Sequence, residues 1–256
     1  MSNNTKQQAW LLWILAVIIT LSSVVYQRKT GPTYPVTGEI NINDKSVSYH
    51  LLRSQNTGEN AEIDLGASKP EFNATLKWKR YKSNDEWRLT PFMMVDGHLK
   101  AYLPSQPPAG KIIYEVNLVT AGGKSIPLTD APVIIRFKGA VPAGVLIPHI
   151  LFMFSAMLMA TRTGMAAWVE SPATLRYTLL TGTFLMLGGL ILGPIVQKYA
   201  FDAYWTGWPW GTDLTDNKTA VAFLSWILAA WRQHKTGNAK AWIISAAVIT
   251  LAVYLI

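Results

Sequence analysis

Residues 133–160 read VIIRFKGAVPAGVLIPHILFMFSAMLMA, and they join the two kinds of sequence in this chain. Residues 133–137 have the residue types and the alternation of a half-buried β-strand. Residues 141–160 are almost continuously apolar, which is typical of a helix that crosses a bilayer. The change occurs within residues 139–144, so we expect a β-domain that is joined to a membrane helix with almost no linker.

The composition also indicates two environments. Half of the 256 residues are hydrophobic and only 15% are charged, against about 25% charged in soluble proteins. Residues 31–139 resemble a soluble domain and carry 13 Lys and Arg against 11 Asp and Glu. The net charge of +8 therefore lies mainly beside the apolar segments, which argues against nucleic-acid binding. Cysteine is absent, which excludes disulfides, thiolate nucleophiles and cysteine-ligated metals.

Five apolar segments are candidate transmembrane helices, because a span needs about 20 apolar residues. They are residues 10–26, 141–160, 175–196, 219–231 and 241–256, of which the fourth is short and is expected to extend into its flanking loops. The first segment has a long apolar region and no small-residue cleavage site, which favours an anchor over a signal peptide. The sequence predicts an N-terminal anchor over residues 1–30 and a four-helix bundle over 140–256.

Lys and Arg in short loops predict the orientation of these helices. Arg162 and Arg176 flank one loop, and Arg232, Lys235 and Lys240 occupy another, so both loops are expected in the cytoplasm. The loop between them, residues 197–218, has two lysines offset by three aspartates and is expected to lie outside. The N-terminus is then cytoplasmic and residues 31–139 are exported.

The exported segment contains runs in which apolar and polar residues alternate, as in β-strands. Turn-forming residues separate these runs at 43–44, 56–58, 104–110 and 122–123. Six or seven short strands in this length indicate an all-β, immunoglobulin-like sandwich inserted after the first helix. The runs are residues 39–42, 46–52, 74–80, 98–103, 112–119 and 133–137.

Two features of this domain are candidate sites. His50 and His98 are isolated histidines, which we expect to serve packing. A basic cluster with interleaved aromatics is expected to be a solvated strand face, and the alternative is a surface for an acidic partner or lipid headgroups. The cluster comprises Lys77, Lys79, Arg80 and Lys82 with Trp78 and Tyr81.

Residues 199–219, YAFDAYWTGWPWGTDLTDNKT, are the densest aromatic stretch. Tyr and Trp favour the membrane–water boundary, so this loop is expected to lie there. Gly207, Pro209 and Gly211 are expected to form its turn. The candidate interface residues are Tyr199, Trp205, Trp208 and Trp210.

Polar residues follow the aromatics. The favoured interpretation is that Thr215 or Asp216 caps the next helix. The alternative is a cation or substrate site at the outer end of the bundle, because two carboxylates and an amide suit a hard cation. Its ligands would be Asp213, Asp216 and Asn217, with His149 within reach.

His149, Met153 and Met157 recur every four residues and share one helical face. A histidine inside a membrane is a candidate functional residue, and a His/Met stripe suits copper or a heme axial position. We favour the alternative that His149 bonds to a neighbouring helix and the methionines fill gaps, with no cofactor. His234 is predicted on the opposite side of the membrane and cannot pair with it. Gly182, Gly188, Gly189 and Gly193 are expected to allow close helix approach.

Three stretches resemble a family of uncharacterised membrane proteins from Bacteroidetes-type bacteria. They are GGLILGPIVQKYAFDAYWTGWPWGTDLTDNKT at 188–219, PHILFMFSAMLMATRTG at 148–164 and YLPSQPPAGKIIYEV at 102–116. The resemblance covers most of the chain and implies a bacterial inner membrane, with no established activity. It also implies a tail with a second histidine after the last helix, which this sequence, ending at Ile256, does not contain. If that tail faces outward, its histidine is a candidate partner for His149.

The leading functional hypothesis is therefore an accessory or binding protein rather than an enzyme. Its partners would be the lipid bilayer and a membrane or periplasmic protein, docked by the exported domain and the aromatic loop. The alternative is a heme- or metal-binding redox protein that uses His149 and the methionines. A transporter is disfavoured because the helices carry few ionisable residues.

Overall fold

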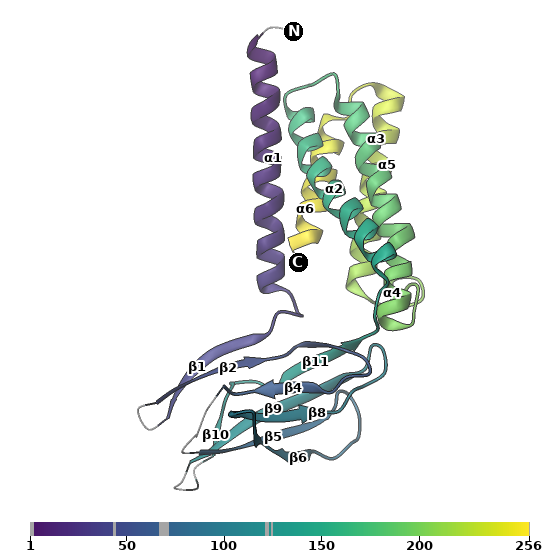
Figure 1. Ribbon diagram of the computed structural model, residues 1–256. Coiled ribbons are helices and arrows are strands. Elements are labelled where there is room, and N and C mark those ends of the chain that lie inside the picture. Colours follow the sequence, from purple (N-terminus) through teal and green to yellow (C-terminus); the bar gives the residue numbers. More distant parts are fainter. Residues whose placement is uncertain (1–2, 43–44, 67–71, 121–122, 124, 256) are drawn as a thin grey trace. The chain divides into compact units, whose positions relative to one another are not determined.

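The computed structural model describes residues 3–42, 45–66, 72–120, 123 and 125–255. The chain divides into two compact units, and most of their elements are labelled in Figure 1. The helical unit comprises Met1–Thr30, Val141–Tyr199 and Ala203–Ile256, and the β unit comprises Gly31–Ala140 with Ala200–Asp202. The predicted turn at 43–44, together with Gly122 and Ile256, lies outside the described residues.

The described part of the helical unit forms five rods. They are α1 (Asn3–Thr30), α2 (Ala143–Trp168), a continuous rod made of α3 (Thr174–Leu185), η1 (Met186–Leu192) and α4 (Gly193–Phe201), α5 (Leu214–Thr236), and α6 (Lys240–Leu255). Helix α2 packs on α1, α3 and α6, and α5 packs on α3 and α6. Four helices therefore form a bundle, with α1 against its side.

Among the described residues, three helices are long and apolar enough to cross a membrane, at Gln7–Thr30, Ala143–Trp168 and Thr174–Phe201. Three of the five predicted spans therefore correspond to helices with the length and composition needed to cross a membrane. Helix α6 is apolar but only 16 residues long, and α5 has polar residues in its first and last turns. Five spans therefore stay a prediction.

Small residues let the bundle helices approach closely, as is usual in membrane bundles. The core shared by α2, α5 and α6 is rich in alanine, and a Cβ on Gly164 would lie only 2.7 Å from the Ala247 Cβ. The indole of Trp226, which is buried, donates to Thr250 Oγ1 at 2.8 Å. Gly188 and Gly189 also face close neighbours, but a Cβ on Gly182 would meet nothing within 4 Å, so the prediction for Gly182 is wrong.

The β unit contains eleven strands within the described ranges, more than the six or seven predicted, because several are only three or four residues long. Each of the six predicted runs coincides with a strand, except that Leu52 lies just past the end of one of them. The strands are β1 (Val36–Ile42), β2 (Lys45–Leu51), β3 (Ser54–Asn56), β4 (Ala61–Asp64), β5 (Phe72–Arg80), β6 (Arg88–Pro91), β7 (Met93–Val95), β8 (His98–Leu103), β9 (Lys111–Thr120), β10 (Ser125–Pro127) and β11 (Val133–Lys138).

These strands form three sheets. Strands β1 and β2 are a hairpin, the larger sheet has the order β3-β11-β9-β5-β6 with β10 beside β9, and the smaller has the order β4-β8-β7. All pairs are antiparallel except β3 with β11. Buried residues of the larger and smaller sheets belong to one core, so these two sheets pack face to face.

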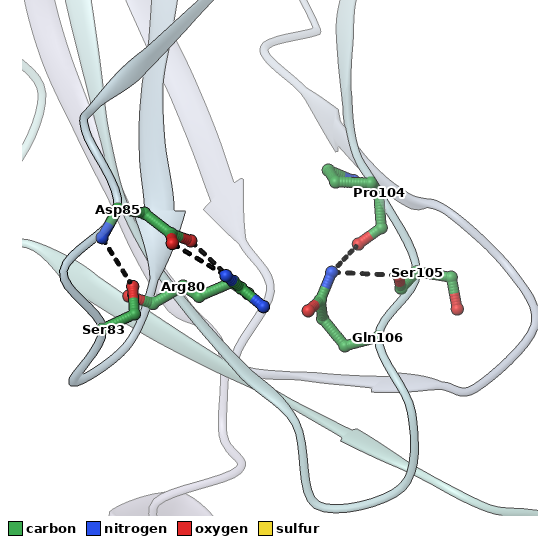
Figure 2. A network of polar contacts seen from close by, with 6 residues as sticks. All are labelled: Arg80, Ser83, Asp85, Pro104, Ser105 and Gln106. Carbon is green, nitrogen blue, oxygen red and sulfur yellow. Dashed lines mark hydrogen bonds and ion pairs between the residues drawn. The ribbon is translucent and has the colours of Figure 1, made fainter.

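The predicted basic cluster divides between two faces of β5. Trp78 is buried in the core, whereas Lys77 and Lys79 lie on the outer face and approach the Trp87 ring at 4.4 and 5.3 Å. The loop after β5 is held by Arg80, which donates to both carboxylate oxygens of Asp85 at 2.6 and 2.8 Å (Figure 2).

The two isolated histidines are on the surface of the β unit. His98 Nδ1 lies 2.9 Å from Asp64 Oδ2, and His50 is exposed. Figure 2 also shows the Gln106 amide donating to the Pro104 and Ser105 carbonyls within the loop before β9.

Candidate functional site: the aromatic loop and His149

The loop between α4 and α5 is organised around Asp216, which is only 8% exposed. One carboxylate oxygen, Oδ2, accepts from the Thr206 amide at 2.6 Å, the Thr206 hydroxyl at 3.2 Å and the Gln197 amide at 3.1 Å. The Gln197 amide also donates to Thr206 Oγ1 at 2.7 Å. The side chain of Asp216 therefore ties the last turns before the loop to the first turn after it.

The N-cap of α5 is Asp213. Its side chain accepts from the Thr215 and Asp216 amides at 2.9 and 3.4 Å. The prediction that Thr215 or Asp216 caps this helix is therefore wrong: both lie inside its first turn. Asp216 accepts instead from the preceding loop, because the chain folds back over the start of α5.

Two glycines allow the chain to turn this tightly. A Cβ on Gly207 would lie 2.7 Å from both Asn217 Oδ1 and the Asp216 Cβ. A Cβ on Gly211 would collide with the Thr206 carbonyl. The Gly207 carbonyl accepts from the Trp210 and Gly211 amides at 3.0 and 2.8 Å, which closes the turn.

The turn presents aromatic rings to the surroundings. Trp208 and Trp210 are 78% and 81% exposed, although the Trp208 amide is held by Asn217 Oδ1 at 2.7 Å. Trp205 is half-buried and donates its indole N–H to the Trp208 carbonyl at 3.1 Å, and Tyr199 is exposed at the end of α4. A held backbone with exposed rings is a surface suited to binding.

His149 contacts the middle of the α3–η1–α4 rod. Its Nδ1 donates to the Gly188 carbonyl at 2.9 Å, and this carbonyl also accepts from the Gly193 amide across a π-helical turn. The donation leaves Nε2 as the ring nitrogen with a lone pair. Gly193 adds no side chain over the ring: a Cβ there would lie 3.9 Å from His149 Cε1.

The two methionines of the stripe have different surroundings. The sulfur of Met153 lies 3.9 Å from Tyr254 Oη. It also lies against Gly188, where an added Cβ would be only 3.0 Å from the sulfur. Met157 is buried, one turn further along α2. Met153 therefore fills the space that the glycines leave, which is the gap-filling role expected of methionine.

The predicted metal ligands are engaged separately. His149 bonds to Gly188, Asp213 and Asp216 accept from amides, and Asn217 Oδ1 accepts from Trp208. Across the described ranges, no three His, Asp or Glu side chains lie close enough together to hold a metal ion.

Gln197 and Thr206 were missed by sequence reasoning, although they complete the Asp216 network. A signal was present for Gln197, because it is an uncharged polar residue at the end of a long apolar run. Thr206 carried no such signal, since its role depends on the fold of the loop.

Comparisons with known proteins do not identify a family or a function for this chain. No family model matches the chain, and no curated protein matches it. Among solved structures, it is similar to a β-1,2-glucanase from Parabacteroides distasonis with 9% identity and a TM-score of 0.25. The match covers 86% of this chain but only 34% of that one, and at this TM-score it carries no functional information.

Proposed function

We propose that this protein is an accessory or binding subunit of a bacterial inner membrane, which docks a membrane or periplasmic protein through the aromatic loop and the β unit. The observation that carries the proposal is the exposure of Trp208 and Trp210 on a turn held by Asp216 and Asn217. Tryptophan is the residue most enriched at the energetic centres of protein interfaces.

The rigidity of the loop favours a protein partner over simple lipid anchoring. Tryptophans partition into the membrane boundary from a flexible segment as well as from a rigid one. Docking to a protein, in contrast, gains affinity when the binding conformation exists beforehand, since less ordering entropy is lost. The hydrogen bonds of Asp216 to Thr206 and Gln197 hold the loop in one conformation.

The β unit supports a recognition role through its strand order. We infer an immunoglobulin-like sandwich, because the smaller sheet, β4-β8-β7, corresponds to strands B-E-D and the central strands β11-β9-β5 to G-F-C of that fold. The parallel pairing of β3 with β11 then corresponds to a first strand that crosses to the other sheet. Domains with this architecture are common on cell surfaces, often as binding modules.

The topology is part of the same proposal. The ends of α2 and α5 and the starts of α3 and α6 lie together, since Ala167, Thr174, Gln233 and Lys240 line one pocket of about 340 Å³. Arg162, Arg176, Arg232 and Lys235 belong to this end, which the positive-inside rule assigns to the cytoplasm. The aromatic loop follows the other end of the bundle and is then periplasmic, as is the β unit.

Site-specific photocrosslinking in intact bacteria tests the docking role. A benzophenone amino acid replaces Trp208 or Trp210, and the matched controls carry it at Trp231 or Trp242, which are exposed on α5 and α6. We expect one discrete protein adduct from positions 208 and 210 that positions 231 and 242 do not give. Adducts with lipid alone at 208 and 210, or the same adducts from all four positions, would contradict the proposal.

A second candidate function is a redox or metal-handling protein that uses His149. It is supported by the Nδ1–H donation to Gly188, because histidines that bind metals usually donate their other ring N–H to a carbonyl or carboxylate. Met153, one turn along the same helix, would supply a soft sulfur ligand. This candidate is tested by an absorption spectrum and elemental analysis of the purified wild type and of His149→Ala. If the wild type shows neither heme bands nor stoichiometric metal, the redox or metal-handling function is refuted.

A further inference from the structure

Arg162 in α2 is buried inside the helical unit. It is 3% exposed, although a guanidinium is charged at every physiological pH. Its Nε and Nη1 atoms have no hydrogen-bond acceptor in the part of the chain that the structure describes. Two buried N–H donors of a charged group without acceptors are unfavourable, so a further interaction would stabilise Arg162.

Two aromatic rings supply part of the interaction that stabilises Arg162. The guanidinium carbon lies 5.3 Å from the centre of the Trp13 ring in α1 and 5.1 Å from that of Tyr177 in α3. These rings also contact each other edge to face at 5.9 Å. Cation–π attraction is weaker than the cost of removing a charge from water, and ring faces do not accept the N–H groups in the way that oxygen does.

The neighbouring helices offer no anion. The sequences of α1, α2, α3 and α6 contain neither Asp nor Glu. Glu170, just after α2, is exposed and paired with Lys240 at 2.9 Å. The first turn of α3 has no side-chain cap, so its positive end also lacks a negative group. These helices therefore supply no carboxylate counter-charge for Arg162, and a negatively charged group of another molecule would complete the site.

We propose that Arg162 binds the phosphate group of an anionic phospholipid at the junction of α1, α2 and α3. Arg162 lies six residues before the end of α2, about 9 Å from that end, which places it near the headgroup level of a bilayer that α2 crosses. Trp10, 71% exposed and one turn before Trp13, provides the aromatic surface typical of that level.

The chemistry of the site fits a phosphate. The oxygens of a phosphate accept charge-assisted hydrogen bonds from a guanidinium, and two donors of Arg162, Nε and Nη1, have no acceptor here. Trp13 and Tyr177 cover the guanidinium, so the phosphate enters where the exposed side of α1 meets α3 by separating these two rings. The inference rests only on these helices crossing a membrane, not on the docking role of the aromatic loop.

Native mass spectrometry of the full chain in mild detergent tests this proposal. Phosphatidylglycerol and phosphatidylcholine with the same acyl chains are titrated into the wild type, Arg162→Met and Arg162→Gln. The control is Arg176→Met, an exposed arginine in the first turn of α3. We expect Arg162→Met and Arg162→Gln to weaken phosphatidylglycerol binding about tenfold, the effect of one lost charge-assisted pair, with little change in Arg176→Met.

The possible results distinguish a phospholipid site at Arg162 from general surface charge and from binding of free phosphate. Wild-type preference for phosphatidylglycerol that disappears in both Arg162 variants supports the site, and the glutamine variant decides if the methionine variant does not fold. Equal binding by wild type and variants overturns it, as does an equal loss in Arg176→Met, which would indicate only general surface charge. Displacement of the lipid by inorganic phosphate at millimolar concentration would refute the lipid source. Crosslinking at Trp208 and Trp210 is independent of every one of these results.

Discussion

Replacing Asp216 by alanine is expected to open the aromatic loop while leaving the helices folded. The variant removes the shared acceptor of the Thr206 amide, the Thr206 hydroxyl and the Gln197 amide. A buried donor left without an acceptor costs about 1–3 kcal/mol. The lower part of that range applies because Thr206 and Gln197 are half-buried, so the loop should lose about 2–4 kcal/mol for the two N–H donors.

Hydrogen exchange followed by mass spectrometry measures this loss. The Thr206 amide is protected only while it bonds to Asp216, and a loss of about 3 kcal/mol speeds exchange through local opening roughly a hundredfold. Peptides within residues 203–213 should show the change, and peptides from α2 and α6 should not. Asp213→Ala is the matched control: losing an N-cap costs about 1 kcal/mol and should affect the first turn of α5 more than Thr206.

Unchanged exchange at Thr206 in Asp216→Ala would refute the reasoning, because it would mean that other contacts hold the turn. A global loss of protection would also count against it. In that case Asp216 would stabilise the whole bundle rather than the loop. Asp216→Asn should give a smaller effect than alanine, since the amide oxygen still accepts one hydrogen bond.

Three further outcomes are expected. Gly207→Ala should destabilise the loop by about 1–3 kcal/mol through crowding, seen as faster proteolysis between α4 and α5. Thr250→Val should cost about 1–3 kcal/mol, because it leaves the buried Trp226 indole without an acceptor, and should lower the Tm in detergent. The hydrogen bond from Arg80 lowers the pKa of Asp85 to about 2, from 3.8, so the pair stabilises the protein above about pH 4 and this contribution disappears as the pH falls toward 2. Arg80→Gln should return the Asp85 pKa toward 3.8 in a carboxyl NMR titration.

The membrane helices and the longer strands could be predicted because their signals are local. Alternation places Leu76 and Trp78 in the core and Lys77 and Lys79 outside, and this follows from the pleat alone. The short strands β3, β6 and β7 have three or four residues, too few for a period to be recognised. They exist because neighbouring strands offer them hydrogen bonds, which is a property of the whole sheet.

In the aromatic loop, too, some features could be predicted from the sequence and others could not. That aromatic residues would line the loop was evident from their density, but the role of each polar residue was not. Asp213 and Asp216 both suit an N-cap, and only the path of the loop decides that Asp213 caps α5 while Asp216 accepts from Thr206. The burial of Arg162 was equally hidden: its position near a helix end suggested a cytoplasmic flank, whereas the packing of Trp13 against Tyr177 encloses it.

The π-helical turn η1 gives the rod between α3 and α4 one residue more per turn than an α-helix has. Its seven residues, Met186–Leu192, therefore turn through about the same angle as six α-helical residues, and at the α-helical pitch they would rotate everything after them by about 100° relative to α3. At that pitch, Gln197 would turn away from Asp216 and the hydrogen bond between them would be lost. The angular position of the tryptophans around the bundle is therefore set by how many residues η1 contains, as well as by which ones.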